Sequence, residues 1–235
     1  MMRLDKFLCE MGVGTRSEVK GCLKKGQVTV NGDVIKKPET KIDESKDIIC
    51  FLGQTLAYEA VQYFLLNKPA GCVTATRDNL SETVMSFLPE NRRDDLFPVG
   101  RLDKDTEGLL LITNDGQLAH ELLSPKKHVD KTYFARIDGE VKEEHIQQFL
   151  DGVDIGDDDM TMPAKLKIIS SGDISEIELT IQEGRFHQVK RMFEAVGTKV
   201  IYLKRISMGP LVLGDLQPGK VRVLTDEEIE QLRNR

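Results

Sequence analysis

Residues 98–116 read Pro-Val-Gly-Arg-Leu-Asp-Lys-Asp-Thr-Glu-Gly-Leu-Leu-Leu-Ile-Thr-Asn-Asp-Gly, a charged loop that leads directly into an apolar strand. Gly100 and Gly108 bound the loop. The strand over Leu109–Thr113 is expected to be buried, and a loop fixed to a buried strand holds its functional groups with little freedom. Asp103 is therefore a candidate functional carboxylate, although most loop aspartates serve as turn or capping residues.

Short apolar runs alternate with helical patterns on both sides of this loop. The predicted strands are Tyr63–Leu66, Leu109–Thr113, Thr132–Ile137, Ala164–Ile169, Ile174–Ile181 and Val200–Ile206. The predicted helices are Gln117–Leu123, Glu143–Leu150, His187–Val196 and Asp226–Arg233. Some strands follow one another directly and others are separated by helices, so residues 61–235 are expected to form an α+β domain whose largely antiparallel mixed sheet is flanked by helices.

The first 45 residues read as a separate unit, which residues 46–60 link to the rest of the chain. Thr15-Arg16-Ser17-Glu18 fits a capping box that opens a helix running to about Lys25. Residues 28–35 alternate around Asn31-Gly32, which is typical of a hairpin with a tight turn. One face of the helix carries Arg16, Lys20 and Lys24 at four-residue spacing. That basic face suits either an RNA backbone or plain solvent.

The charge of the chain is unevenly distributed. The net charge of −6 argues mildly against general nucleic-acid binding. However, residues 1–41 hold nine Lys/Arg against five Asp/Glu, and residues 183–205 hold six Lys/Arg against two Glu. Two basic patches on an acidic chain indicate specific RNA contacts.

Several chemistries lack their sequence patterns. The chain contains no phosphate-binding loop, no His-Glu-x-x-His and no Gly-x-Ser-x-Gly, and its four histidines are dispersed. The Asp157-Asp158-Asp159 run lacks the spacing of a calcium loop and is expected to be solvated. Kinase, metalloprotease and serine-hydrolase activities are therefore not expected, and no metal is predicted.

The sequence also favours an intracellular location. No apolar run approaches the roughly 18 residues of a membrane span, and the N-terminus lacks the apolar core of a secretion signal. The four cysteines form no Cys-x-x-Cys pair and are expected to be reduced. We therefore expect a cytoplasmic protein, and nothing in the sequence suggests more than a monomer.

The N-terminal unit resembles a known RNA-binding module. Arg3–Leu8, Thr15–Ser17 and the pattern over Gly26–Gly32 are similar to the alpha-L RNA-binding module of a small-subunit ribosomal protein, which also precedes many RNA-modifying enzymes. The resemblance implies that the RNA-binding residues of this unit are Arg3, Arg16, Lys20 and Lys24.

The rest of the chain resembles the RNA pseudouridine synthases. The similar motifs are Asn67-Lys68-Pro69-x-Gly71, Gly100–Leu109, Lys131-Thr132-Tyr133 and Glu183–Arg191. Their order after an alpha-L module resembles the RsuA family, whose members modify ribosomal RNA. The Met160–Ala164 and Phe186–Arg191 stretches look most like the small-subunit (16S) enzymes of that family, and the large-subunit (23S) enzymes are the alternative. The resemblance implies an isomerase that converts uridine to pseudouridine in ribosomal RNA or in a pre-ribosomal particle.

The resemblance also implies a set of catalytic residues. Asp103 matches the catalytic carboxylate, which either attacks C1′ of the ribose or removes the C2′ proton. Tyr133 matches the aromatic residue that stacks on the uracil extruded from the RNA. Lys190 would keep Asp103 ionised, and it stands where many synthases have an arginine, so a bidentate pairing with Asp103 is not expected.

The resemblance implies substrate-binding residues as well. Arg101 would hold the flipped nucleotide or its phosphate. Arg185 and Arg191 are the other predicted substrate-binding residues. The reaction needs neither redox nor metal chemistry, so no cofactor is predicted.

Two other classes of function compete with this interpretation. A non-catalytic ribosome-assembly factor would depend on the basic helix and would not need Asp103. A glycoside hydrolase would need a pair of carboxyl groups such as Asp103 and Asp105. In an extended loop those two side chains are expected to point apart, and the chain has no Trp to build a sugar cleft.

Overall fold

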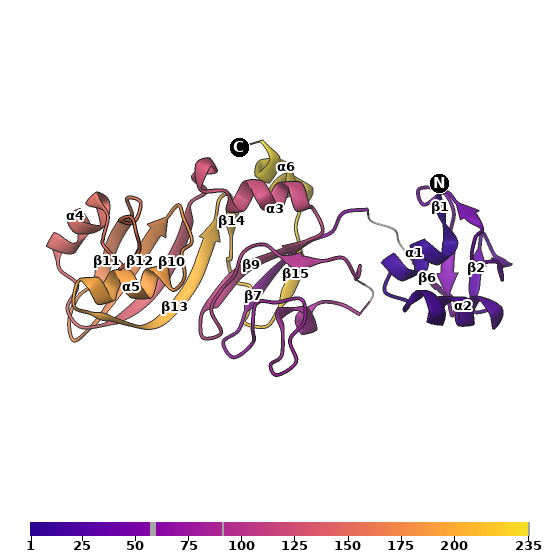
Figure 1. The fold of residues 1–235 in the computed structure, drawn as a ribbon, viewed down its shortest axis with the longest axis horizontal. Helices are drawn as coiled ribbons and strands as arrows, with labels where there is room; N and C mark the ends of the chain where they lie inside the picture. Colours follow the sequence, from indigo (N-terminus) through magenta and orange to yellow (C-terminus); the bar gives the residue numbers. More distant parts are fainter. Residues whose placement is uncertain (57–59, 91, 235) are drawn as a thin grey trace. The chain divides into compact units, whose positions relative to one another are not determined.

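The computed structural model describes residues 1–56, 60–90 and 92–234 of the chain, which fold into two compact units. Residues Met1–Gln62 and Leu88–Leu96 form the smaller unit, and Tyr63–Phe87 with Phe97–Arg235 form the larger one (Figure 1). Both units combine helices with sheets, as the α+β prediction requires. Among the described residues no helix is long and apolar enough to cross a membrane.

The smaller unit packs two helices against short strands. Its elements are β1 (Met2–Arg3), α1 (Leu4–Glu10), α2 (Arg16–Lys24), β2 (Val28–Val30), β3 (Asp33–Val34), β4 (Lys41–Ile42), β5 (Ile49–Phe51) and β6 (Gln54–Thr55). The predicted capping box opens α2, since the Thr15 side chain accepts from the Glu18 backbone N–H and the Glu18 carboxylate accepts from that of Thr15. The predicted hairpin forms between β2 and β3.

The predicted linker is in part a pair of strands. β5 pairs with β2, and β6 pairs with β5, in a sheet of order β3-β2-β5-β6. Ile49 is 1% exposed and belongs to the core between α1, α2 and this sheet. Assigning residues 46–60 to a linker was therefore wrong for β5 and β6, because strands of three and two residues are too short for their alternation to stand out. Residues 57–59 of that linker lie outside the described residues.

The larger unit is built on a nine-stranded mixed sheet. Its strands are β7 (Tyr63–Lys68), β8 (Phe97–Pro98), β9 (Glu107–Thr113), β10 (Lys131–Asp138), β11 (Lys165–Ser170), β12 (Ile174–Ile181), β13 (Lys199–Met208), β14 (Leu211–Val212) and β15 (Val221–Val223). Its helices are α3 (Gly116–Leu123), α4 (Glu143–Asp151), α5 (Gln188–Ala195) and α6 (Asp226–Arg233), with 3-10 turns at Val84–Phe87 and Pro125–Lys127. Every predicted strand and helix of this unit is present.

The strand order divides the sheet into two halves. Along the order β11-β12-β10-β13-β9-β7-β15, neighbours are antiparallel except β13 and β9, which are parallel. The first half, β7 and β9 with β8 and β15 beside them, lies with α3 and α6, while the second half, β10 to β13, carries α4 and α5 (Figure 1). The parallel pair joins the halves at Gly108, which pairs with Arg205.

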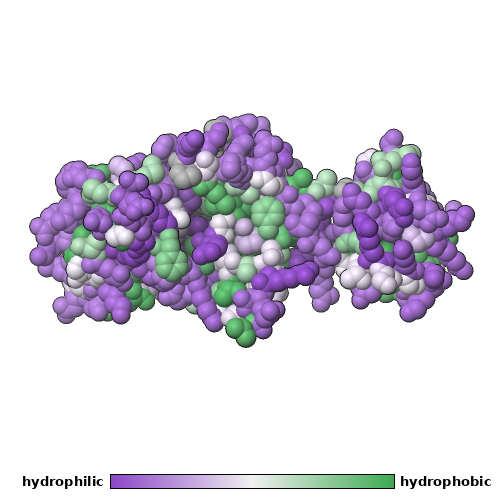
Figure 2. Space-filling view, viewed as in Figure 1, coloured by the Kyte–Doolittle hydropathy of each residue, from purple (hydrophilic) through white to green (hydrophobic). Residues whose placement is uncertain are grey.

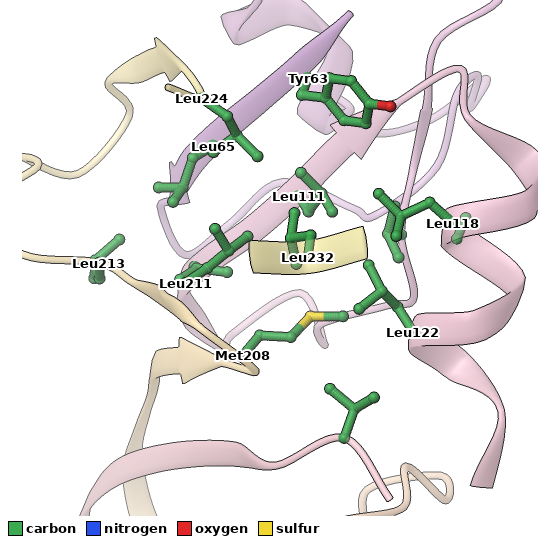
Figure 3. Close-up of a cluster of buried hydrophobic side chains, with 14 residues drawn as sticks. Tyr63, Leu65, Leu111, Leu118, Leu122, Met208, Leu211, Leu213, Leu224 and Leu232 are labelled. Carbon is green, nitrogen blue, oxygen red and sulfur yellow. The ribbon is translucent and has the colours of Figure 1, made fainter. Parts of the chain in front are cut away.

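A leucine-rich core fixes the first half. Leu65 and Leu111 of β7 and β9 are fully buried and face Leu118 and Leu122 of α3 and Leu232 of α6 (Figure 3). Burial of one such side chain stabilises the fold by about 1.5–3 kcal/mol. The strand that follows the charged loop is therefore as rigidly held as its apolar sequence predicts. On the face seen in Figure 2, hydrophilic side chains predominate and hydrophobic ones gather near the middle of the larger unit.

Candidate active site

A buried lysine holds the loop that carries Asp103 through hydrogen bonds to its backbone carbonyls. Lys68, at the end of β7, is completely buried. Its ammonium donates to the backbone carbonyls of Asp103 (3.0 Å), Lys104 (3.3 Å) and Thr106 (2.9 Å), and to that of Pro69 (3.1 Å). Burial lowers the pKa of Lys68, and these carbonyl contacts replace the water that the ammonium has lost. The loop is thereby held to β7 as well as to the strand that follows it.

Two further contacts fix the same loop from the segment after β7. The Thr74 hydroxyl donates to the Leu102 carbonyl at 2.7 Å and accepts from the Leu102 N–H at 3.2 Å. The Gly71 N–H donates to the Lys104 carbonyl at 2.7 Å. The backbone on both sides of Asp103 is therefore tied down, which is the preorganisation that a reacting group needs.

Lys190 of α5 lies between two carboxylates. Its ammonium is 3.3 Å from the Asp103 carboxylate and 2.7 Å from that of Asp105, to which it also donates its hydrogen bonds. Burial lowers the pKa of Lys190, but the hydrogen bond to Asp105 and the charges of Asp103 and Asp105 raise it above its usual value. The hydrogen bond from Lys190 in turn lowers the pKa of Asp105. The ammonium is thus firmly charged beside Asp103.

The expectation that Asp103 and Asp105 point apart is wrong. The loop turns between them, since the Thr106 N–H donates to the Asp103 carbonyl at 3.1 Å, and both carboxylates reach the same ammonium. This geometry still does not suit a glycoside hydrolase. Such an enzyme keeps one carboxyl group protonated as its acid, whereas the lowered pKa of Asp105 favours the ionised form.

Asp103, Lys190 and Tyr133 meet in one cavity of the larger unit. A narrow lobe of about 70 Å³ is lined by all three side chains, together with Arg101 and Thr106. Tyr133 of β10 is 8% exposed, so its ring is a wall of the cavity and not a surface group. A wider lobe of about 390 Å³ also includes Asp103, Tyr133 and Arg101. A carboxylate, a cation and an aromatic ring therefore face a shared space.

Two side chains at the rim extend this cavity. Arg101 is exposed and lines both lobes, and among the described residues it has no hydrogen bond or ion pair. His187 has a left-handed backbone (φ +49°), and its Nε2 lies 3.6 Å from the Asp103 carboxylate. Its ring stacks on Phe186 with 3.8 Å between the ring centroids. A strained non-glycine residue at such a place is typical of a functional site.

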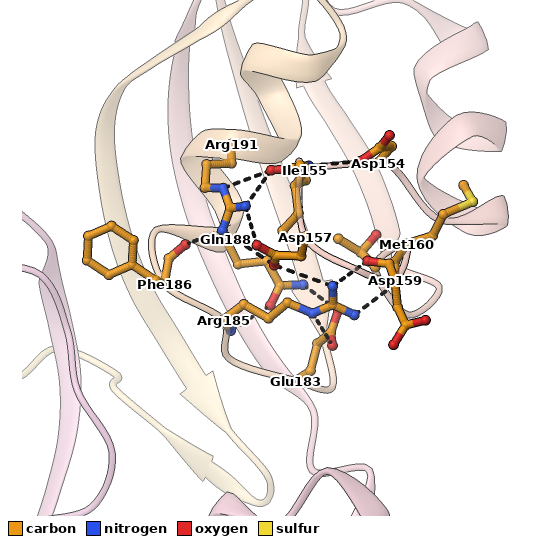
Figure 4. Close-up of polar contacts among 12 residues, drawn as sticks. Asp154, Ile155, Asp157, Asp159, Met160, Glu183, Arg185, Phe186, Gln188 and Arg191 are labelled. Atoms are coloured by element: carbon orange, nitrogen blue, oxygen red, sulfur yellow. Dashed lines mark hydrogen bonds and ion pairs between the residues drawn. The ribbon is translucent and has the colours of Figure 1, made fainter.

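The other two predicted substrate-binding arginines hold a loop instead (Figure 4). Arg185 donates to the Glu183 carboxylate (2.9 Å) and to the carbonyls of Asp159 (2.6 Å) and Met160 (2.7 Å). It lines both lobes of the cavity, but its donors are engaged. Its role in binding substrate stays a prediction.

Arg191 ties the same loop to α5. Its guanidinium donates to the Ile155 and Phe186 carbonyls and pairs with the Asp157 carboxylate at 2.5 Å. The hydrogen bond from Arg191 lowers the pKa of Asp157. Asp157 is therefore an ion-pair partner, contrary to the expectation of a merely solvated acidic loop. A substrate-binding role for Arg191 also stays a prediction.

The predicted RNA-binding residues lie in the smaller unit. Arg16, Lys20 and Lys24 are exposed on α2, opposite the buried Val19 and Leu23. Arg3 is exposed too, but its guanidinium makes two hydrogen bonds to Asp5, at 2.9 and 2.8 Å. Three of the four cations thus form one accessible stripe, and Arg3 is partly neutralised.

Sequence reasoning left several groups of the larger unit without a role. Lys68 stands inside a recognised motif, but nothing in the motif shows that its ammonium turns back onto the loop carbonyls. Asp105 was weighed only as half of a hydrolase pair, and His187 was given no role of its own within the Glu183–Arg191 motif. Each contact joins segments far apart in sequence, so no local pattern could have indicated it. Among the described residues no group of three or more metal-ligating side chains comes together.

Comparisons with known proteins show which families the chain matches. Residues 62–195 match the RNA pseudouridylate synthase family, and residues 2–49 match the S4 domain family. An uncharacterized RNA pseudouridine synthase of Bacillus subtilis is 47% identical, with 98% of each chain covered. The ribosomal small subunit pseudouridine synthase A of Vibrio cholerae is 41% identical, covering 98% of this chain and 99% of that protein. A crystal structure of a pseudouridylate synthase is 40% identical, with a TM-score of 0.70 over 99% of this chain and all of that one.

Proposed function

This chain belongs to the RNA pseudouridylate synthase family, and from that premise we propose that it isomerises uridine in small-subunit (16S) ribosomal RNA with Asp103 as the catalytic carboxylate. One observation carries the assignment of Asp103: its carboxylate, the Lys190 ammonium and the Tyr133 ring line the same cavity. The names of the Vibrio cholerae and Escherichia coli relatives, each 41% identical, support small-subunit RNA as the substrate.

The cavity suits the chemistry of the isomerisation. The C1′–N1 bond must break and a C1′–C5 bond must form, while C5 loses a proton and N1 gains one. Whether Asp103 attacks C1′ or removes the C2′ proton, its carboxylate must be ionised. The Lys190 ammonium lies 3.3 Å from this carboxylate and offsets its negative charge. Tyr133 offers a largely buried ring on which the turned uracil can stack.

In this proposal the smaller unit binds the RNA. Arg16, Lys20 and Lys24 form an exposed basic stripe on α2, within the part of the chain that matches the S4 domain family. Basic side chains of this kind position an RNA through its phosphates and do not read its sequence. We place the enzyme in the cytoplasm because its four free thiols suit a reducing compartment. In this proposal it acts as a monomer on ribosomal RNA or on an assembling particle.

The proposal is tested by release of tritium from RNA labelled at C5 of uridine. The wild type should release tritium from unmodified small-subunit rRNA and not from large-subunit rRNA. Asp103→Asn should lose more than about 10²-fold in rate while its melting temperature stays near that of the wild type. Asp138→Asn, which changes an exposed aspartate at the end of β10, serves as the matched control and should stay fully active.

Three outcomes of this experiment would count against the proposal. An active Asp103→Asn enzyme would remove the role of the carboxylate. Release from large-subunit RNA alone would overturn the choice of substrate. A non-catalytic assembly factor would show no release at all, and its function would depend on the α2 stripe, so that charge reversal of Arg16, Lys20 and Lys24 would be its damaging change.

A further inference from the structure

A pair of buried cations lines the wider lobe of the active-site cavity. Lys131, at the start of β10, is 6% exposed, and Arg205 of β13 is 2% exposed. Both belong to the lobe that Asp103 and Tyr133 also line. Neither residue has a part in the chemistry proposed above.

The sheet places both cations on the same face as Tyr133. Lys131 is two residues before Tyr133 on β10, so their side chains point to the same side. Arg205 is the direct cross-strand partner of Tyr133, after a register shift between Thr132 and Tyr133. Bulges of this kind are used next to active sites to re-aim a side chain. The two cations therefore flank the ring proposed to hold the uracil.

The protein offers these two cations few hydrogen-bond acceptors and no carboxylate partner among the described residues. Lys131 donates to the Val129 carbonyl at 3.1 Å, and the Nε of Arg205 donates to the Leu109 carbonyl at 2.8 Å. Nη2 of Arg205 is buried and has no hydrogen-bond partner, and within the described part of the chain no carboxylate lies within salt-bridge distance of either side chain. An unpaired buried charge destabilises the folded state, so natural proteins keep one only where something offsets that effect.

The nearby carboxylates are already engaged elsewhere. Asp130 accepts from Gln182 at 2.8 Å, and Glu183 accepts from Arg185 and Gln188, both at 2.9 Å. Asp103, the one acidic residue among those that line the lobe, faces Lys190 and His187. Burial, and next the charge of Arg205, lower the pKa of Lys131, whereas Asp130 and Glu183 only partly oppose this. An anion from outside would complete this part of the lobe.

We propose that Lys131 and Arg205 bind a backbone phosphodiester of the RNA next to the target uridine. This inference rests on the proposed function, because it takes the ligand of the cavity to be an RNA strand. The ribose lies between a base and its phosphate, so a base stacked on Tyr133 brings its own phosphate close to the neighbouring positions of the sheet. Residues two apart on a strand are about 7 Å from each other, which is within that reach. Arg101 at the rim adds a third cation, and among the described residues its side chain has no hydrogen bond or ion pair.

The first test uses Lys131→Met, which keeps the length of the side chain and removes its charge. Removing an unpaired buried charge should raise the melting temperature of the free protein by about 2–4 °C. Inorganic phosphate at millimolar concentration should raise the melting temperature of the wild type, since a ligand of the folded state stabilises it, and should not do so for Lys131→Met. Lys165→Met changes an exposed lysine of β11 and is the matched control, which should keep the phosphate effect.

The second test measures binding of unmodified small-subunit rRNA over a range of salt concentrations. Lys131→Met should weaken binding on the order of tenfold and reduce the slope of log K against log salt by about 0.7–0.9. Lys131→Arg should restore most of the affinity. Arg205→Gln should act in the same way as Lys131→Met, and Lys165→Met should leave both the affinity and the slope unchanged.

The outcomes separate this site from the catalytic proposal. A lost phosphate effect in Lys131→Met with an intact Lys165→Met control supports the site, whether or not tritium is released from RNA. The site is overturned if the wild type shows no phosphate effect, if Lys131→Met retains it, or if Lys131→Met melts well below the wild type. If only the proposed pseudouridine synthase activity is wrong, phosphate should still raise the melting temperature of the wild type and not that of Lys131→Met, but no tritium should be released from the RNA.

Discussion

The two halves of the large sheet each bury one lysine and treat it in opposite ways. Lys68, in the β7–β9 half, is 0% exposed and donates to four backbone carbonyls. Lys131, in the β10–β13 half, is 6% exposed and donates to one carbonyl. A buried cation whose donors are satisfied holds the fold together. A buried cation whose donors are not satisfied leaves room for a ligand, which is the basis of the phosphate site proposed for Lys131.

The halves also divide the chemistry between them. The β7–β9 half supplies Asp103 on its anchored loop, and the β10–β13 half supplies Tyr133 and, through α5, Lys190. The carboxylate therefore meets its cation and the proposed stacking ring only if the two halves keep their relative position. That position depends on the parallel contact between β9 and β13.

Gly108→Ala should have the largest effect because it acts on that contact. Gly108 has φ +103°, and a Cβ there would lie 2.2 Å from the Arg205 carbonyl oxygen. The Cβ is fixed to Cα and the oxygen belongs to the backbone of β13, so neither can move without shifting a strand. We expect the free energy of unfolding to fall by more than about 3 kcal/mol, measured by urea denaturation, and activity to be lost.

Gly184→Ala is the matched control for this change. A Cβ at Gly184 meets no atom within 4 Å, although the residue lines the same cavity. Its stability should change by less than about 1 kcal/mol. If Gly108→Ala proves as stable as Gly184→Ala, the two halves are not held by this close approach.

Lys68→Met should have the next largest effect and the opposite sign to Lys131→Met. The substitution removes the donors that hold the carbonyls of residues 103, 104 and 106, so the free energy of unfolding should fall by about 2 kcal/mol. The loop that positions Asp103 loosens as well. The rate of tritium release should therefore fall about tenfold or more, as misplacement of a catalytic group by an ångström is costly.

The pair of variants tests the comparison itself. Lys68→Met should melt below the wild type, and Lys131→Met should melt above it. The same direction of change in both variants would mean that hydrogen-bond satisfaction does not distinguish the two lysines. Equal activity of Lys68→Met and the wild type would mean that the loop is held without Lys68.

The sequence predicts most helices and long strands of this fold well, but it does not predict which short strands pair with them. Ile174–Ile181 and Asp226–Arg233 are observed with the predicted bounds, because clear alternation and a capping box mark them locally. By contrast, β14 and β15 have two and three residues and were not expected. Short edge strands owe their existence to pairing with a longer strand, which no local pattern reveals.

The same limit applies to the site. Asp103, Tyr133 and Lys190 could be selected from their motifs, and the structure brings them to one cavity. What the motifs lack is the pairing of charges across distant segments, such as Lys190 with Asp105 and Arg191 with Asp157. The register shift that sets Arg205 opposite Tyr133 is equally invisible, because it depends on one extra residue in β13, where Arg205 lies 72 positions after Tyr133.

Asp105→Asn should have the smallest effect, and that effect should appear mainly in the pH dependence of tritium release. Lys190 keeps a raised pKa through its hydrogen bond to Asp105 and the charges of both aspartates, against the lowering by burial. Its charged form is stabilised below its ordinary pKa, and that stabilisation is lost as the pH rises through the raised value. Without Asp105 the lowering by burial weighs more, so the alkaline limb of tritium release should move to lower pH.

Near pH 7 the same variant should retain activity within about fivefold, because Asp103 still lies 3.3 Å from the ammonium and a pairing with an exposed carboxylate is weak. Asp158→Asn, in the exposed acidic loop, is the control and should leave the profile unchanged. An unmoved alkaline limb in Asp105→Asn would show that Asp103 alone keeps Lys190 charged. The β10–β13 half would then need only one carboxylate from the β7–β9 half, and the close contact to Asp105 would be incidental to the reaction.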